Sequence, residues 1–414
     1  MIRSRRAVPA EFDVAVIGGG VVGSTVAALL GGLSLRVAAV EAAAAATPAD
    51  PKEYDLRVYA LTRASARILA HAGAWQGIER RRHGCFRRME VWDAHSRGRI
   101  SFDSAALAEP TLGYIVEQRA LCDALGERLR ELPNVTVMRP ASLQSWEGMA
   151  DRLEVVLEDG RRVSARLLVG ADGAASRVRT VAGIGYERHG YDQQAVVCNV
   201  RTERPHEDTA RQRFLAEGPL AFLPLDDAHQ SSIVWSTTPA HAERLLGLDT
   251  EDFRGELATA FGHRLGRVLE AGPRAAFELA KARAERYVLP RIALAGDAAH
   301  AIHPLAGQGA NLGLLDAATL AEVVAEAAAE GADIGALRVL RRYERWRAGE
   351  NRLMQATMDG FKHLFGSDLK TVRWLRGAGL SLADRCQPAK ELIMRLAMGL
   401  SGDLPAAARL RGIS

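Results

Sequence analysis

Residues 294–316 read LAGDAAHAIHPLAGQGANLGLLD, and the rest of the chain is interpreted from this stretch outward. It is dense in Gly and Ala, so its backbone can come close to a bound molecule and adopt angles that other residues resist. An apolar helical run follows, and free N–H groups around residues 307–312 predict an anion or carbonyl site at a helix N-terminus. The apolar run at 291–295 predicts a buried strand that delivers Asp297 to its C-terminal end.

A nucleotide-binding pattern lies near the start of the chain. Residues 12–17, FDVAVI, predict a buried parallel strand, and GGGVVG follows at 18–23. We expect a helix over 24–30 and a second strand over 35–40 that ends at Glu41. In such a unit the glycines let backbone N–H groups reach a pyrophosphate, and the acid accepts bonds from a ribose hydroxyl. The pattern does not by itself choose FAD over NAD.

A third motif, GADGAASRVR, occupies residues 170–179 after a predicted strand at 162–169. An acid and a Gly at a strand end, then a Ser and two Arg at a helix start, can hold one edge of a pyrophosphate. The alternative is an Asp-Gly turn with an ordinary helix cap. Because two other motifs point to a nucleotide, we favour the binding role.

These motifs carry a resemblance to a known family. Residues 294–316 resemble the second flavin motif of the group A, single-component flavoprotein aromatic hydroxylases. The form HPLAGQGANLGLLDA is most similar to the ubiquinone-biosynthesis hydroxylases. The run at 172–179 resembles the family's D-G-x-x-S-x-V-R motif, which serves both FAD and NAD(P)H. Similarity extends over nearly the whole chain, including FLAEGPLAFLPL at 214–225 and KELIMRLAMGLSGDLP at 390–405.

The resemblance implies a set of site residues. Arg57, in a D-x-R-x-x-A-L segment, maps onto an Arg that contacts the flavin; the alternative is a surface Arg at a helix entry. Gln118 matches a Gln that bonds the ribityl chain, although Arg119 replaces the usual Asn. His303 and Pro304 are expected beside the flavin ring at the reaction centre, with a purely structural His303 as the alternative. The implied cofactor-binding residues are Gly18, Gly20, Gly23, Glu41, Arg57, Gln118, Asp172, Gly296, Asp297, Gly307, Gln308, Gly309, Asn311 and Leu312.

The expected fold is α/β, similar to that of p-hydroxybenzoate hydroxylase. A Rossmann-like FAD-binding domain would carry an inserted, mostly antiparallel β-sheet substrate domain and a helical C-terminal region. The expected bounds are 11–80, 107–182 and 287–335 for the FAD-binding domain, 83–106 and 183–286 for the substrate domain, and 336–414 for the helical region.

The expected substrate domain rests on alternating patterns. Four alternating segments between residues 195 and 236 predict antiparallel strands, and a helical pattern follows at Thr250–Leu269. Three aromatic residues of these strands are candidates for the pocket wall, although packing in the sheet core is favoured: Phe214, Phe222 and Trp235.

Composition narrows the class further. The chain has 414 residues, is 48% hydrophobic and 25% charged, and carries a net charge of only +4, so an ordinary globular protein of two or three domains is expected. The basic residues at 80–82 and 87–88 form no stripe, so nucleic-acid binding is not expected. Four scattered Cys without a CxxC argue against disulfides or zinc and fit a cytoplasmic protein. The two His of AAHAIHP lack carboxylate partners, so no metal site is predicted.

Membrane contact is expected to be peripheral at most. The chain shows no secretory signal and no apolar run long enough to span a bilayer. Residues 388–400, PAKELIMRLAMGL, predict a helix with Leu392, Leu396 and Leu400 on one face. Such a face is usually core or an oligomer contact, and docking at the inner face of the membrane is the alternative.

The resemblance implies an FAD-dependent monooxygenase that hydroxylates the ring of a polyprenylated phenol in ubiquinone biosynthesis. It would use NAD(P)H and O₂ through a flavin C4a-hydroperoxide. It would act as a homo-oligomer, within a biosynthetic complex, or both. The alternatives are a hydroxylase of small soluble aromatics, a flavin reductase of prenyl chains, and a flavin-bound, non-catalytic scaffold. Turnover with a phenol separates these classes.

Overall fold

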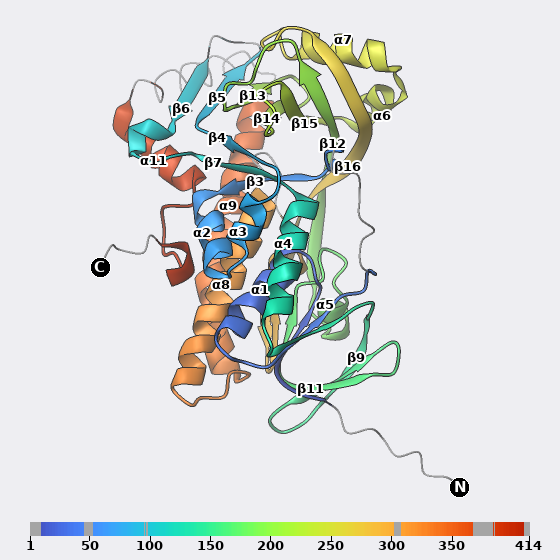
Figure 1. Cartoon of the computed structure of the whole chain (residues 1–414), viewed down its shortest axis with the longest axis vertical. Helices are drawn as coiled ribbons and strands as arrows, with labels where there is room; N and C mark the ends of the chain where they lie inside the picture. Colours follow the sequence, from blue (N-terminus) through green and yellow to red (C-terminus); the bar gives the residue numbers. More distant parts are fainter. Residues whose placement is uncertain are drawn as a thin grey trace.

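The computed structural model describes residues 10–44, 53–94, 96, 98–301, 308–366, 384 and 386–409. Figure 1 shows two parts stacked along the long axis, a lower part of sheet and helices and an upper part built on a second sheet. The long helix α9 (Leu337–Gly366) runs from the lower part into the upper one.

The lower sheet is parallel at its centre. β1 (Ala10–Ile17) pairs in parallel with β2 (Val37–Val40) and with β11 (Arg162–Gly170), which pairs in parallel with β18 (Ile292–Leu294). The register places Ile17 opposite Gly170, and Gly170 opposite Leu294. The carboxyl ends of β1, β11 and β18 are therefore level, and the three sequence motifs that follow them meet at one edge. The remaining strands are β8 (Val135–Met138), β9 (Leu143–Gly148), β10 (Leu153–Leu157) and β17 (Val288–Leu289).

Helices cover this sheet, and a small second layer joins it to the upper part. Among them α1 (Val21–Gly32) packs against α4 (Gln118–Glu131) and α8 (Gln308–Ala329). A three-stranded sheet lies between the two parts, in the order β3 (Val58–Thr62), β7 (Gly113–Glu117), β4 (His83–Phe86). The shorter helices are α2 (Arg63–His71), α3 (Trp75–Glu79) and α5 (Arg177–Val181).

The upper sheet has eight strands and is mainly antiparallel, as the alternating patterns predicted. Its order is β19 (His300–Ala301), β16 (Val268–Ala284), β12 (Tyr186–Thr202), β15 (Gln230–Thr237), β14 (Pro219–Pro224), β13 (Thr209–Phe214), β5 (Arg88–Asp93), β6 (Arg99–Asp103). Only the β13–β5 contact is parallel among these described strands. On one face lie α6 (Pro239–Gly247) and α7 (Thr250–Ala260), and α11 (Gln387–Ala397) lies near β5 and β6 (Figure 1).

The expected helix over Thr250–Leu269 is wrong in its second half. α7 ends at Ala260, and Gly262, His263 and Gly266 all have positive φ angles, of 66°, 50° and 75°. Left-handed residues of this kind end a helix. From Val268 the chain enters β16, which pairs with β12 along its length. Left-handed turns therefore end the helical pattern, and at residues 268–269 tertiary pairing overrides it.

Phe222 and Trp235 point away from the face of the upper sheet that lines the cavity. Phe222 and Trp235 are buried in a core with residues of α6 and α7, and the Phe222 ring stacks on Phe261 at 3.9 Å between centroids. The neighbouring residues Ala221 and Val234 face the opposite side, because side chains alternate along a strand. The core role is thus confirmed for Phe222 and Trp235, and Phe214 is buried as well.

We predict that Phe222→Ala lowers stability without changing ligand preference. Truncating a buried Phe costs about 3–5 kcal/mol, through lost burial and the cavity left behind. Thermal unfolding followed by circular dichroism should show a clearly lower Tm. An unchanged Tm combined with an altered ligand preference would instead place Phe222 in the ligand-binding wall.

Candidate active site

Close-packed glycines shape the turn after β1. A Cβ atom on Gly18, where φ is +107°, would lie 2.3 Å from the carbonyl oxygen of Ala171. A Cβ on Gly23 would lie 1.9 Å from the carbonyl oxygen of Gly18. Gly20 has open space at the same point and lines a cavity. The turn therefore leaves a bare backbone at the N-terminus of α1, which suits a pyrophosphate.

Glu41 stands at the end of β2 beside this turn. Its carboxylate accepts a hydrogen bond from the N–H of Gly19 at 2.5 Å and one from the N–H of Ala43 at 2.7 Å. A carboxylate has about four lone-pair positions, so capacity is left for ribose hydroxyls. Glu41 also lines the cavity, as a ribose contact requires.

Asp172 organises the turn that follows β11. Its carboxylate accepts hydrogen bonds from the Ser176 hydroxyl at 2.5 Å and from the backbone N–H groups of Arg177 and Val178 at 2.7 and 3.1 Å. These bonds cap the start of α5. Although Asp172 lines the cavity, its described hydrogen bonds organise the Asp-Gly turn.

Arg179, the second Arg of the third motif, makes buried contacts within the protein. Its guanidinium donates to the carbonyl oxygens of Ala174 at 2.7 Å and Ala298 at 3.0 Å. It also lies 3.5 Å from the ring centroid of Tyr186, whose hydroxyl donates to the carbonyl oxygen of Asp297 at 3.2 Å. Arg179 thereby ties the third motif to the second flavin motif. The signal in the sequence was the second Arg of the SRVR run.

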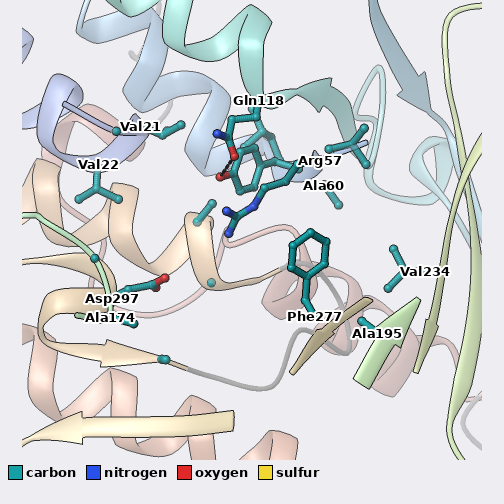
Figure 2. Close-up of a pocket in the computed structure, with 18 of the residues that line it drawn as sticks. Val21, Val22, Arg57, Ala60, Gln118, Ala174, Ala195, Val234, Phe277 and Asp297 are labelled. Carbon is teal, nitrogen blue, oxygen red and sulfur yellow. Dashed lines mark hydrogen bonds between the residues drawn. The ribbon is translucent and has the colours of Figure 1, made fainter. Parts of the chain in front are cut away.

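Asp297, Arg57 and Gln118 meet around the same cavity, as Figure 2 shows. Asp297 is open to the cavity, but protein encloses the cavity on most sides. This desolvation raises the pKa of Asp297 more than the nearby charges of His300 and Arg57 lower it. The side-chain oxygen of Gln118 accepts a hydrogen bond from the Tyr59 hydroxyl at 3.1 Å. The cavity thus has a carboxylate ready to accept bonds from ligand hydroxyls.

The rest of the second flavin motif is divided between the cavity and the core. Gly309 lines the cavity, whereas Leu312 is buried. Asn311 accepts bonds from the Thr62 N–H and the Ser65 hydroxyl at 3.0 and 2.6 Å, so it fastens α8 to β3 and α2. Gln308 begins α8. His303, Pro304 and Gly307 lie outside the described residues, so their expected roles remain predictions.

A buried ionic network behind the cavity was missed from sequence. Asp316 is fully buried and accepts bonds from His300 Nε2 at 2.5 Å, Arg347 Nε at 2.8 Å and the Gly296 N–H at 3.0 Å. Burial opposes its ionisation, but the charges and hydrogen bonds of His300 and Arg347 outweigh burial and hold its pKa at about 2. The network fixes both ends of the Gly296–His300 segment, which carries Asp297.

The cavity extends from this nucleotide end to the upper sheet. Its volume is about 1130 Å³, larger than a typical pocket for one small ligand. Phe277, half exposed, projects into it across from Arg57 (Figure 2). Toward β5, β6 and the segment that holds α11 the lining is apolar, with Phe86, Met89, Phe102, Met394 and Met398. One cavity therefore joins a nucleotide site to an apolar branch.

The chain is similar to known flavoproteins over nearly its whole length. The FAD binding domain family matches residues 11–355. The 3-demethoxyubiquinol 3-hydroxylase of Escherichia coli (strain K12) is 38% identical over 390 residues, which are 94% of this chain and 98% of that protein. The ubiquinone hydroxylase UbiL of Rhodospirillum rubrum is 40% identical over 407 residues, 97% of this chain and 93% of that protein. In fold, p-nitrophenol 4-monooxygenase PnpA from Pseudomonas putida DLL-E4 gives a TM-score of 0.76 at 21% identity, covering 95% of this chain and 100% of that one.

Fold and site together define an FAD-dependent monooxygenase. The residues present fit FAD, because the Gly18–Gly23 turn has no room for side chains at Gly18 and Gly23, and Glu41 and Asp297 line the cavity as acceptors. Within this class, the chain belongs to the ubiquinone-biosynthesis hydroxylase family. FAD, when bound, supplies the redox chemistry with NAD(P)H and O₂. The protein binds and orients it and encloses the reaction.

We predict that FAD affinity falls as pH is lowered through the raised pKa of Asp297. A carboxylate accepts hydroxyl bonds more strongly than a neutral acid, so protonation weakens the contact. Asp297→Asn should weaken FAD binding at neutral pH by roughly 1.5–3 kcal/mol and flatten this part of the pH profile. Titration of apoprotein by flavin fluorescence measures both effects. Asp159→Asn, on a surface hairpin, is the control. If Asp297→Asn showed the same pH dependence of FAD affinity as the unaltered protein, Asp297 would not be part of the cofactor site.

We predict that Asp316→Asn destabilises the protein by about 3–5 kcal/mol, because Arg347 then keeps a buried charge without its main partner. The pKa of Asp316 is lowered from 3.8 to about 2, so its stabilising contribution is complete above about pH 4 and is lost as the pH falls through about 2. Thermal unfolding against pH measures this. The control is Glu326→Gln, which breaks an exposed Arg342 pair between the same two helices and should change Tm little. Similar losses of Tm in Asp316→Asn and Glu326→Gln would contradict a special role for the buried pair.

Proposed function

We propose that this protein hydroxylates the aromatic ring of a polyprenylated phenol in ubiquinone biosynthesis, with FAD, NAD(P)H and O₂. The names of the two relatives above, a demethoxyubiquinol hydroxylase and a ubiquinone hydroxylase, support this substrate class. The observation that carries the proposal is the single cavity that links Asp297 to an apolar branch beneath α11. A small soluble phenol would not need that branch.

The residues of this chain would act by position and by exclusion of water. Glu41 and Asp297 would hold the two hydroxyl-bearing ends of the cofactor, and the upper sheet would cover the ring. A water-excluding wall strengthens every electrostatic contact inside and protects reactive species from hydrolysis. We also propose that His303 and Pro304 lie at the reaction centre, between the Asp297 contact and α8. The His303→Ala variant should then lose more of its hydroxylation activity than of its affinity for FAD.

We further propose that the protein meets its substrate at a membrane surface. None of the described helices is long and apolar enough to cross a bilayer. Each buried CH₂ holds a lipid tail in the bilayer by about 0.8 kcal/mol, so a long prenyl chain will not leave it freely. A protein that uses such a substrate must therefore take it from the lipid or from a complex.

α11 is suited to this contact because it separates the cavity from solvent. Met394 and Met398 are buried and line the cavity, whereas Leu392 and Ile393 are 57% and 37% exposed. The predicted single stripe is wrong at Leu400, which lies beyond the end of α11 and packs with the Met394 and Met398 cluster. The turn at Gly399, where φ is +67°, redirects the chain there.

We predict that phenols with a prenyl tail, offered in lipid vesicles, are hydroxylated with higher kcat/KM than the matching tail-free phenols. The reason is that the apolar branch contributes binding only when a tail fills it. Product formation and NAD(P)H oxidation are measured together. Higher kcat/KM for tail-free phenols would favour the small-aromatic hydroxylase. NAD(P)H oxidation without any hydroxylated product would favour the reductase, and absence of both would favour the scaffold.

The docking role of α11 has its own test, by vesicle flotation. Leu392→Asp should reduce binding to anionic vesicles, because it places a charge on the proposed lipid face. Leu353→Asp is the matched control, since Leu353 is 69% exposed but lies on α9. Equal flotation of the two variants would remove α11 as the docking element while leaving the substrate class intact.

A further inference from the structure

Two buried polar atoms on neighbouring strands of the upper sheet have no hydrogen-bond partner among the described residues. Ser232 on β15 is fully buried and lines the cavity, and its Oγ has no partner within the described part of the chain. Asn199 on β12 uses its amide nitrogen to donate to the carbonyl oxygen of Asp55 at 3.1 Å, but its Oδ1 is likewise buried and unpaired there. Buried polar atoms are nearly always paired, so two such atoms together call for a ligand group.

The strand register brings these two atoms to one place. Asn199 and Ser232 are directly opposite each other on β12 and β15. Directly opposite residues of an antiparallel pair project from the same face of the sheet. That face is the cavity side, because Val197 and Val234 of the same two strands also line the cavity. Asn199 and Ser232 therefore project as neighbours from the cavity side of the sheet, and of the two Ser232 lines the cavity itself.

The same cross-strand row becomes apolar away from this pair. Ser232 is opposite Leu223 on β14, and the register continues through Ala210 on β13 to Met89 on β5 and Phe102 on β6. All of these residues line the cavity. Four steps of roughly 4.8 Å each give a track of roughly 19 Å from Ser232 to β6. Met89 and Phe102 pack near Met394 and Met398, so the track ends beneath α11.

We propose that Ser232 and Asn199 form the subsite for the ring hydroxyl of the substrate, and that the apolar row from Leu223 to Phe102 takes its tail. A phenol hydroxyl both donates and accepts, so it can donate to Asn199 Oδ1 and accept from the Ser232 hydroxyl. An ether oxygen or a methyl group cannot satisfy both atoms. This inference rests on the proposed function, and it adds the residues that orient the ring.

The test measures binding to the oxidised FAD-loaded protein, through the change in flavin absorbance. The ligands are a prenylated phenol and the matched prenylated ring without its hydroxyl. Ser232→Ala should weaken binding of the phenol by roughly threefold to tenfold, as for one neutral hydrogen bond. It should leave the ring without a hydroxyl unchanged. Equal effects on the two ligands, or no effect on either, would overturn the subsite.

Ser231→Ala is the matched control. Ser231 is the preceding residue of β15, is also fully buried, and has an Oγ without a partner among the described residues. Its side chain projects from the opposite face, beside Ile233 and Trp235 of the core under α6 and α7. Ser231→Ala should therefore change the binding of neither ligand. If Ser232→Ala loses its flavin, Ser232→Cys keeps the volume with a weaker donor and should give the same selective loss; failure of that selectivity would overturn the subsite.

The tail track is tested by filling it. Ala210→Phe places a large ring midway along the row, so it should weaken binding of the prenylated phenol by at least tenfold and leave the tail-free phenol unchanged. An equal loss for both phenols would overturn the track. Failure of the proposed function is a separate result, because it would appear as absence of phenol hydroxylation by the unaltered protein, whatever the binding data.

Discussion

The buried carboxylate of Asp316 holds the Gly296–His300 segment in place, and the rest of the site depends on this contact. Asp316 has no exposed surface, yet it remains ionised because His300, Arg347 and the Gly296 N–H all donate to it. Removal of one partner would leave a charge stranded in a medium that solvates it poorly. The network therefore permits one arrangement of α8, α9 and the Gly296–His300 segment, with Asp297 facing the cavity.

The parallel register then brings the other groups to the same edge. The strands β1, β11 and β18 end level with one another, so the Gly18–Gly23 turn, the Asp-Gly motif and Asp297 meet although they are far apart in sequence. Arg179 joins two of these segments through the carbonyl oxygens of Ala174 and Ala298. The upper sheet closes the cavity with a wall whose side chains alternate between core and cavity, which separates Phe222 from Ala221.

Local patterns predicted the strands, the glycine turn and the cavity positions of Glu41 and Asp297, because those features depend on residues adjacent in sequence. They failed where a distant partner decides the outcome. The expected helix ended at Ala260, where left-handed residues turn the chain toward β16 and its pairing with β12. Asp316 acts through Arg347, 31 positions away, and Ser232 is opposite Asn199 and Leu223 on neighbouring strands. No local signal revealed these contacts.

We propose that this cavity brings FAD, O₂ and a polyprenylated phenol together for ring hydroxylation. The most direct measurement supplies the FAD-loaded protein with NAD(P)H, isotopically labelled O₂ and a polyprenylated phenol in vesicles, and analyses the product by mass spectrometry. The account predicts a phenol with one added oxygen atom that carries the label. A product whose new oxygen comes from water, or NAD(P)H oxidation that leaves the phenol unchanged, would contradict it.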